Sequence, residues 1–128
     1  MVIDTSVLVA ILRAEHDADD LYQRLMDSSP RRLSAANYLE LSMVMSSEEE
    51  HGDLVRVDRF LEAAEIEIVA VTQHDGLLAR NAFLRFGKGR HAAALNFGDC
   101  FSYALAIRLR EPLLFKGDDF SLTDIAKA

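Results

Sequence analysis

Residues 1–12 read MVIDTSVLVAIL. Two strand-forming residues lead into an acid and two hydroxyl side chains, and an unbroken apolar run follows. This order predicts a buried strand that ends at Asp4 and passes at once into a helix. Ligands gather at such strand ends in open α/β sheets, which makes Asp4 a candidate site residue. The structural alternative is that Asp4 is an N-cap, but Ser6 can cap the helix by itself.

Strand and helix patterns alternate along the rest of the chain. Residues 17–26, 36–45, 54–61, 77–83 and 101–109 have apolar side chains at helical spacing. Extended segments are expected around Leu33, at 66–71 and at 113–115, and the acidic run at 48–50 predicts a solvated break. Strands separated by helices predict an α/β fold, with a parallel sheet covered on both faces.

Length and composition limit the function classes. The 128 residues suit a single domain spanning residues 1–128, and no apolar run approaches the length of a membrane span. Cys100 is the only cysteine, so no internal disulfide can form and a reducing, cytoplasmic location is expected. The formal charge of −7 disfavours contact with nucleic acid unless the basic residues are concentrated locally or cations intervene.

Further carboxylates repeat the placement of Asp4 beside buried sequence. They are Glu40 within a predicted helix, Asp99 at the start of an apolar helix, and Asp118 and Asp119 after the last strand. Taken singly, each has a structural alternative as a helix cap, a turn residue or a surface residue. Taken together, carboxylates without His or Cys neighbours favour Mg²⁺ or Mn²⁺ over zinc.

Four segments resemble the PIN-domain ribonucleases, and more narrowly the VapC toxins of prokaryotic toxin–antitoxin pairs. The segments read VIDTS (2–6), SAANYLE (34–40), LNFGDCFSYA (95–104) and LLFKGDDF (113–120). The resemblance spans essentially the whole chain. It implies a three-layer sandwich with a parallel sheet of about five strands, Mg²⁺- or Mn²⁺-dependent RNA cleavage, and a cytoplasmic toxin that forms a homodimer and is inhibited by a VapB-like antitoxin.

The resemblance also assigns the acids. Asp4, Glu40 and Asp99 match the family's three best-defined acidic positions, the expected metal ligands. The fourth position is open between Asp118 and Asp119, because the usual hydroxyl-and-acid pattern falls on Phe115 and Gly117 here. Thr5 and Ser6 match the hydroxyl positions beside the first acid, where they would orient Asp4 or a metal-bound water and contact substrate.

Residues 86–91, FGKGRH, form the only compact basic stretch. Lys88 and Arg90 are candidate phosphate contacts, and a solvated turn after a helix is the structural alternative. For the antitoxin, the apolar residues around 21–25 and 41–45 are a candidate groove for a partner helix, unless they are core.

Two other function classes remain open. One is a Mg²⁺-dependent phosphoryl-transfer domain, although Asp-x-Asp after the first strand and a G-x-x-x-x-G-K-[ST] loop are both missing. The other is a non-catalytic module that uses its acids to bind a partner. A nuclease assay with Mn²⁺ separates all three.

Overall fold

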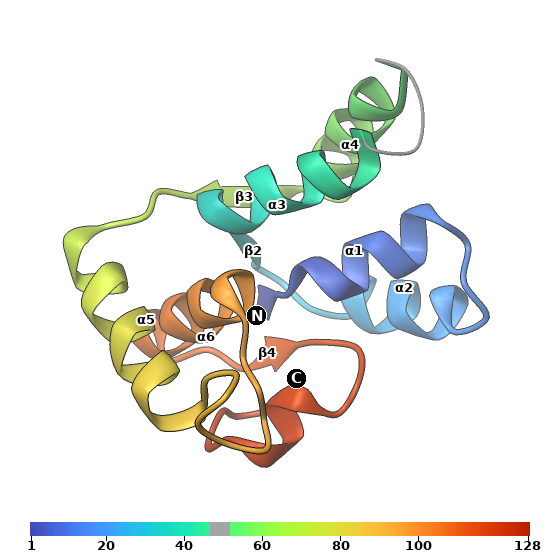
Figure 1. The fold of residues 1–128 in the computed structure, drawn as a ribbon. Coiled ribbons are helices and arrows are strands. Elements are labelled where there is room, and N and C mark those ends of the chain that lie inside the picture. The colour runs from blue at the N-terminus through green and yellow to red at the C-terminus, as the bar shows by residue number, and fades with distance from the viewer. Residues whose placement is uncertain (47–51) are drawn as a thin grey trace.

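The computed structural model describes residues 1–46 and 52–128, and Figure 1 shows the arrangement of its elements. The strands are β1 (Val2–Ile3), β2 (Arg31–Ser34), β3 (Ile66–Val69) and β4 (Leu113–Leu114). The helices are α1 (Thr5–Leu12), α2 (Ala18–Met26), α3 (Ala35–Ser46), α4 (Gly52–Ala63), α5 (Gln73–Phe86), α6 (Phe97–Leu109) and the short 3₁₀ helix η1 (Asp119–Leu122). The break expected at 48–50 lies outside the described residues.

The strands form one parallel sheet in the order β3-β2-β1-β4. In the described residues the sheet has four strands, where about five were expected. Beyond β4, the segment near the end of the chain makes a single parallel bridge, Leu113 to Lys127, with Leu113 N–H donating to Ala126 O at 2.8 Å. This one bridge stands where a fifth strand would lie.

Alternation of side chains along the strands divides the core into two layers. Ile3 and Leu114 face the helices α1 to α4, whereas Val2 and Leu113 face α5 and α6. All four side chains are fully buried. The expected covering of both sheet faces is therefore confirmed, and in Figure 1 α5 and α6 lie to the left of the strands and α1 and α2 to the right.

Side-chain caps define where α1 and α6 begin. Helix α1 starts at Thr5, directly after the strand end as the sequence predicts, and its N-cap is Asp4, which accepts the Ser6 N–H at 3.0 Å. The structural alternative for Asp4, an N-cap, is therefore confirmed, and Ser6 does not cap this helix. Helix α6 starts at Phe97, four residues before the apolar stretch, because Asn96 and Asp99 form a capping box there.

The candidate groove for a partner helix is core instead. Leu21, Leu25, Leu41 and Met45 are all buried in the cluster around α1, α2 and α3. Of the residues in the candidate groove, Val44 is half-buried and lines a small cavity beside Glu40. Helical spacing of apolar residues predicts a buried face but not what covers it, and here the protein covers it itself. In residues 1–46 and 52–128, none of the helices has the length and apolar character needed to span a membrane.

Candidate active site

The carboxylate of Asp4 lies at the carboxyl end of β1 and is held by hydroxyl groups. Its side chain is 3% exposed. Ser102 Oγ donates to Oδ1 at 2.6 Å, and Ser6 Oγ donates to Oδ2 at 2.6 Å. Ser102 reaches it from α6, 98 positions along the chain. The orientation of Asp4 therefore depends on helices from both faces of the sheet.

Glu40 is placed by the packing of α3 against α6. Asn37, one turn earlier on α3 and fully buried, donates from Nδ2 to the Gly98 carbonyl at 3.0 Å and to Thr5 Oγ1 at 3.2 Å, with Glu40 Oε1 at 3.5 Å. A Cβ added to Gly98 would overlap the Glu40 carboxylate. Thus Gly98 leaves the space that this carboxylate occupies.

Asp99 lies in the first turn of α6, where its Oδ2 accepts the Asn96 N–H at 3.0 Å. Burial raises the pKa of Asp99 from 3.8 to about 7, against the lowering effect of the Asn96 N–H. Repulsion from Asp4, Glu40 and Asp119 raises this pKa further. Each of these three carboxylates therefore acts on Asp99, and we call the four residues the acidic cluster.

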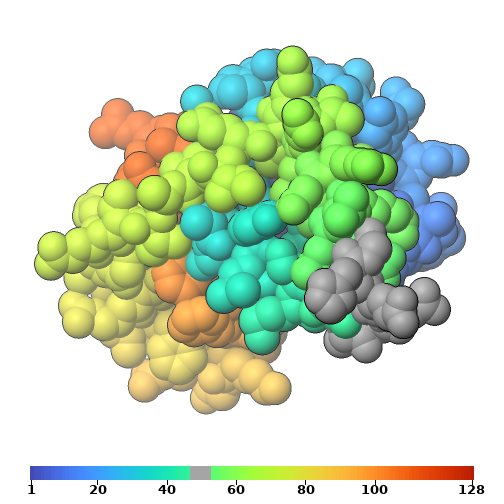
Figure 2. Space-filling view, turned by 90° about the horizontal axis from the view of Figure 1, so that it is seen from above, coloured from blue at the N-terminus to red at the C-terminus, as the bar shows by residue number. Residues whose placement is uncertain are grey.

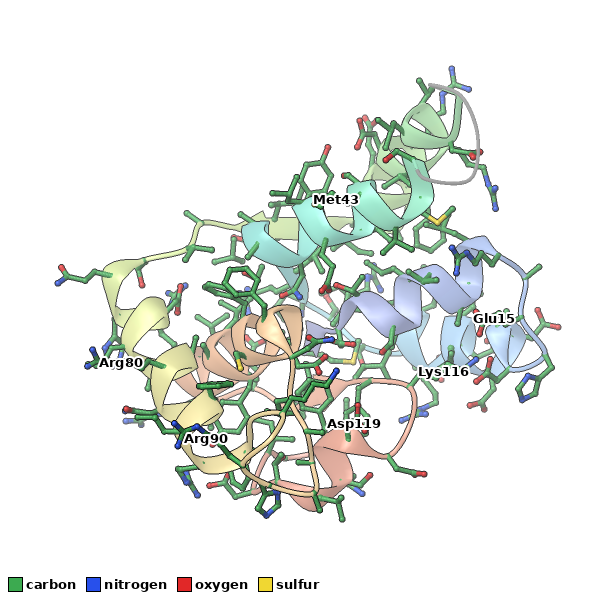
Figure 3. All side chains as sticks on the ribbon, in the orientation of Figure 1. Glu15, Met43, Arg80, Arg90, Lys116 and Asp119 are labelled. Carbon is green, nitrogen blue, oxygen red and sulfur yellow. The ribbon has the colours of Figure 1, made fainter. Side chains whose placement is uncertain are left out.

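Both candidates for the fourth acid lie at the turn into η1, where Asp118 precedes the helix and Asp119 begins it. Figure 3 labels Asp119, which is an exposed residue like Asp118. The charge of Asp119 raises the pKa of Asp99, so Asp119 is the candidate that we carry forward.

The hydroxyl candidates have different contacts. Ser6 Oγ accepts the Lys116 N–H at 3.1 Å while it donates to Asp4, so it joins the segment after β4 to the site. The Lys116 side chain points away from Asp4 and donates to the carboxylates of Glu15 and Asp17, the latter at 2.9 Å. Figure 3 labels Lys116 and Glu15 close to each other. Thr5 contacts Asn37 instead of Asp4.

The predicted phosphate contacts lie beside the cluster, not in it. Lys88 and Arg90 are exposed in the turn after α5, and Arg90 Cζ lies 5.4 Å from the centroid of the Phe83 ring. Lys88 lines a cavity together with Asn96, the residue that caps α6. Lys88 therefore lies near Asn96, which is hydrogen-bonded to Asp99.

The acidic cluster suits a hydrated divalent cation better than a closed cage. In residues 1–46 and 52–128, no three His, Cys, Asp or Glu side chains come close enough together to hold one ion. Mg²⁺ keeps several waters and needs only one or two carboxylates. The buried Asn37 Oδ1 has no hydrogen-bond partner among the described residues, and it adds a free oxygen beside Glu40. These groups are oxygen donors, which such a cation prefers, and a bound cation would relieve the repulsion of the other carboxylates on Asp99.

Sequence reasoning missed three residues that build this site: Asn37, Gly98 and Ser102. A polar residue inside an otherwise apolar helix is the available signal for Ser102, and an Asn one turn before an acid is the signal for Asn37. Their partners lie about 60 to 100 positions away, so no local pattern reveals the contacts.

A family model described as "PIN domain" matches residues 1–126. The chain belongs to the PIN-domain family. This PIN-domain protein is 47% identical over 129 residues to ribonuclease VapC28 of Mycobacterium tuberculosis, covering 100% of this chain and 97% of that one. It is 49% identical over 126 residues to ribonuclease VapC of Mycolicibacterium smegmatis, covering 98% of each. The resemblance carried by the four sequence segments is confirmed.

The fold also has a solved counterpart. Mycobacterium tuberculosis VapC20, described as a sarcin–ricin loop cleaving toxin, superposes with a TM-score of 0.77 over 99% of this chain and 97% of that one. At 18% identity this likeness concerns the fold. It confirms the PIN-like α/β architecture expected from the sequence.

Proposed function

We propose that this PIN-domain protein is a Mg²⁺- or Mn²⁺-dependent endoribonuclease that acts as the toxin of a toxin–antitoxin pair. The observation that carries the proposal is the approach of Asp4, Glu40 and Asp99 at the carboxyl end of β1. Ser102 of α6 donates to Asp4, and Asn37 of α3 joins Glu40 to Thr5 and to Gly98, the neighbour of Asp99. Full-length relatives named VapC ribonucleases support the same activity.

In this proposal, Asp4, Glu40 and Asp99 would bind a hydrated cation, with its water molecules between the ion and the carboxylates that do not reach it, and Asp119 would contribute through its charge. A bound divalent ion lowers the pKa of a water molecule and neutralises charge on a scissile phosphate. Ser6 and Ser102 hold the Asp4 carboxylate in one orientation, and Asn37 fixes α3 against α6 so that Glu40 stays in place. The site is thereby preorganised by contacts across the sheet.

The substrate is proposed to be RNA, encountered in the cytoplasm. Lys88 and Arg90 would hold flanking phosphates, and Ser6 would contact the cleaved strand beside Asp4. Thr5, which was expected to contact substrate, is buried and accepts from Asn37, so it would position that residue instead. An antitoxin that delivers an Arg or Lys to the acids would compete with the cation for the same charge. A homodimer is part of the same proposal, and light scattering of the purified protein tests it.

The nuclease test uses Asp4→Asn and Asp99→Asn, which keep side-chain shape but remove ligand charge. Both variants should remain folded by circular dichroism and lose RNA cleavage in Mn²⁺, and chelator should abolish the wild-type activity. Asp19→Asn, an exposed position on α2, is the matched control and should cleave like the wild type. Full activity of Asp99→Asn, or cleavage in excess chelator, contradicts the proposal.

The toxin assignment has its own test. Overproduction should arrest growth, and co-expression of the neighbouring antitoxin gene should restore it. The purified complex should bind Mn²⁺ more weakly than the free protein, as measured by calorimetry. RNA binding without cleavage favours a binding module, and phosphoryl transfer without RNA cleavage favours a phosphoryl-transfer domain.

A further inference from the structure

An apolar groove of about 570 Å³ runs between α5 and α6, next to the acidic cluster. We call it the α5–α6 groove. Its apolar lining comes from Ala79, Phe83, Leu95, Phe97, Cys100 and Phe101. Arg80 and Lys88 also line it, and among the described residues no carboxylate does so. Figure 3 shows Arg80 and Arg90 on this side of the molecule.

Aromatic rings are unusually accessible at this groove. The Phe97 side chain is 81% exposed and Phe83 is 40% exposed. Phe101 packs edge-on against Phe97, with 5.0 Å between the ring centroids, and so supports that ring from behind. The guanidinium of Arg90 lies over Phe83. Such large apolar exposure is costly in water and marks a surface that binds something.

Phe97 connects this groove to the acids. It also lines a smaller cavity of about 260 Å³ that contains Glu40 and Gly98. Asn96, at the near end of the groove, caps α6 together with Asp99. Figure 2 shows the orange segment of α6 between the teal of α3 and the yellow of α5 on one face. A ligand lying on Phe97 is therefore beside the acidic cluster.

The charge around the groove selects the kind of ligand. The protein as a whole carries 21 acids against 14 bases, yet the groove lining is cationic. A second, open cavity of about 620 Å³ shares Gly76 and Arg80 with the groove and extends along α5. A groove with exposed aromatic rings and cations suits single-stranded nucleic acid, because its bases can stack on the rings while its phosphates face Arg and Lys.

We propose that the α5–α6 groove binds unpaired bases of the RNA substrate, with a base stacked on Phe97 next to the scissile bond. This inference rests on the proposed ribonuclease function and adds that the substrate must be unstacked on one side of the cut. A paired A-form helix buries its base faces and has none to offer the ring.

Binding is tested without cleavage, in EDTA, with a short unpaired oligoribonucleotide that carries 2-aminopurine. Stacking on Phe97 should quench the fluorescence, and Phe97→Ala and Phe97→Leu should weaken binding about 5- to 100-fold and abolish the quench. Phe97→Tyr should restore both. Val55→Ala, an exposed apolar position on α4, should change neither. The same oligonucleotide in a duplex should compete weakly.

The outcomes separate this proposal from the function it rests on. If Phe97→Ala binds the probe like the wild type while the wild type cleaves RNA in Mn²⁺, the groove assignment is wrong and the nuclease stands. If the wild type binds with a quench but never cleaves, the groove stands and the nuclease fails. If Phe97→Ala only reduces the mass measured by light scattering, the ring belongs to a contact between copies of this chain and the proposal is overturned.

Discussion

Gly98 lies against the carboxylate of Glu40, where any larger residue would collide with it. Glu40 is a flexible side chain, so Gly98→Ala should displace the carboxylate and leave the fold intact. A displacement near 1 Å at a catalytic group costs about 100-fold in rate, so we expect cleavage in Mn²⁺ to fall about 10- to 100-fold.

Asp19→Asn, an exposed position on α2 away from the acidic cluster and the α5–α6 groove, is the control. It should cleave like the wild type. Thermal unfolding of both variants checks that the loss is local. An unchanged rate in Gly98→Ala would show that Glu40 has no fixed role.

The charge on Asp99 works against the fold when no cation is bound. Burial first, and then repulsion from three neighbouring acids, raise its pKa to about 7 in the folded protein. The folded state therefore binds a proton that the unfolded state has already lost between pH 4 and 7, and stability falls as the pH rises through that range.

It follows that Asp99→Asn should stabilise the protein in chelator at pH 8, by about 1–2 kcal/mol, which is less than the full shift implies because water reaches the group. The advantage should shrink steadily toward pH 4. Urea denaturation at several pH values measures it. A variant less stable than the wild type at pH 8 would show that the Asn96 contact outweighs the repulsion.

At the scale of elements, one ion pair joins the two helices behind the groove. Asp75, 3% exposed in the first turn of α5, accepts Arg108 Nε of α6 at 2.5 Å and the Thr72 N–H at 2.9 Å. Burial acts to raise the pKa of Asp75, but the hydrogen bond from Arg108 and the Thr72 N–H outweigh it, and the net pKa is lowered.

Asp75→Asn should therefore destabilise the fold by about 1–3 kcal/mol at pH 7, because it leaves Arg108 without its charged partner. A carboxylate with a lowered pKa contributes above its unfolded value and loses that contribution as the pH falls through the folded one. The difference from the wild type should thus persist to pH 5 and close below about pH 4. Asp20→Asn, from the exposed Asp20–Arg24 pair, should change stability by less than about 0.5 kcal/mol.

The elements themselves were largely predictable from local patterns. Residues 1–12 predict β1 and α1, and the β-branched run predicts β3. Both predictions succeed because the apolar pattern of a buried strand lies in consecutive residues. The strand at 113–115 was predicted, but the shortening of a fifth strand to one bridge at Lys127 depends on the sheet edge and has no local signal.

The site was predictable as a set of acids and not as a geometry. Family resemblance assigned Asp4, Glu40 and Asp99, whereas the electrostatic effect of Asp119 on Asp99 depends on the turn into η1. The hydrogen bond that Ser102 donates to Asp4 depends on how α6 packs against the sheet, which no local pattern indicates. The groove expected from Leu21 and Leu41 was wrong because amphipathic spacing does not distinguish a covered face from an open one.

At the scale of the whole molecule, an acidic protein is proposed to bind a polyanion. Lys88 and Arg90 are exposed and lie on the cationic side of the chain, so Lys88→Ala combined with Arg90→Ala should weaken RNA binding. Each lost phosphate contact also removes counterion release, so the slope of log affinity against log salt should flatten by about one to two. Cleavage at saturating RNA should change less.

The salt titration uses the same unpaired oligonucleotide, with Arg13→Ala combined with Lys127→Ala as a control of equal charge. A control that flattens the slope equally would mean that only net charge matters. An unchanged slope in the Lys88 and Arg90 variant would show that these residues make no phosphate contacts and belong to a solvated turn.

The order of the strands in the sheet also bears on when the protein becomes active during its synthesis. β1 is made first, yet it lies between β2 and β4, and β4 is made last of the strands. The four acids are spread from position 4 to position 119. A ribosome must therefore release nearly the whole chain before any cleavage centre exists, and a half-finished chain is harmless. Translation adds about 5–20 residues per second. The cell making this protein thus has several seconds in which an inhibitor already present can meet the nascent chain before its activity begins.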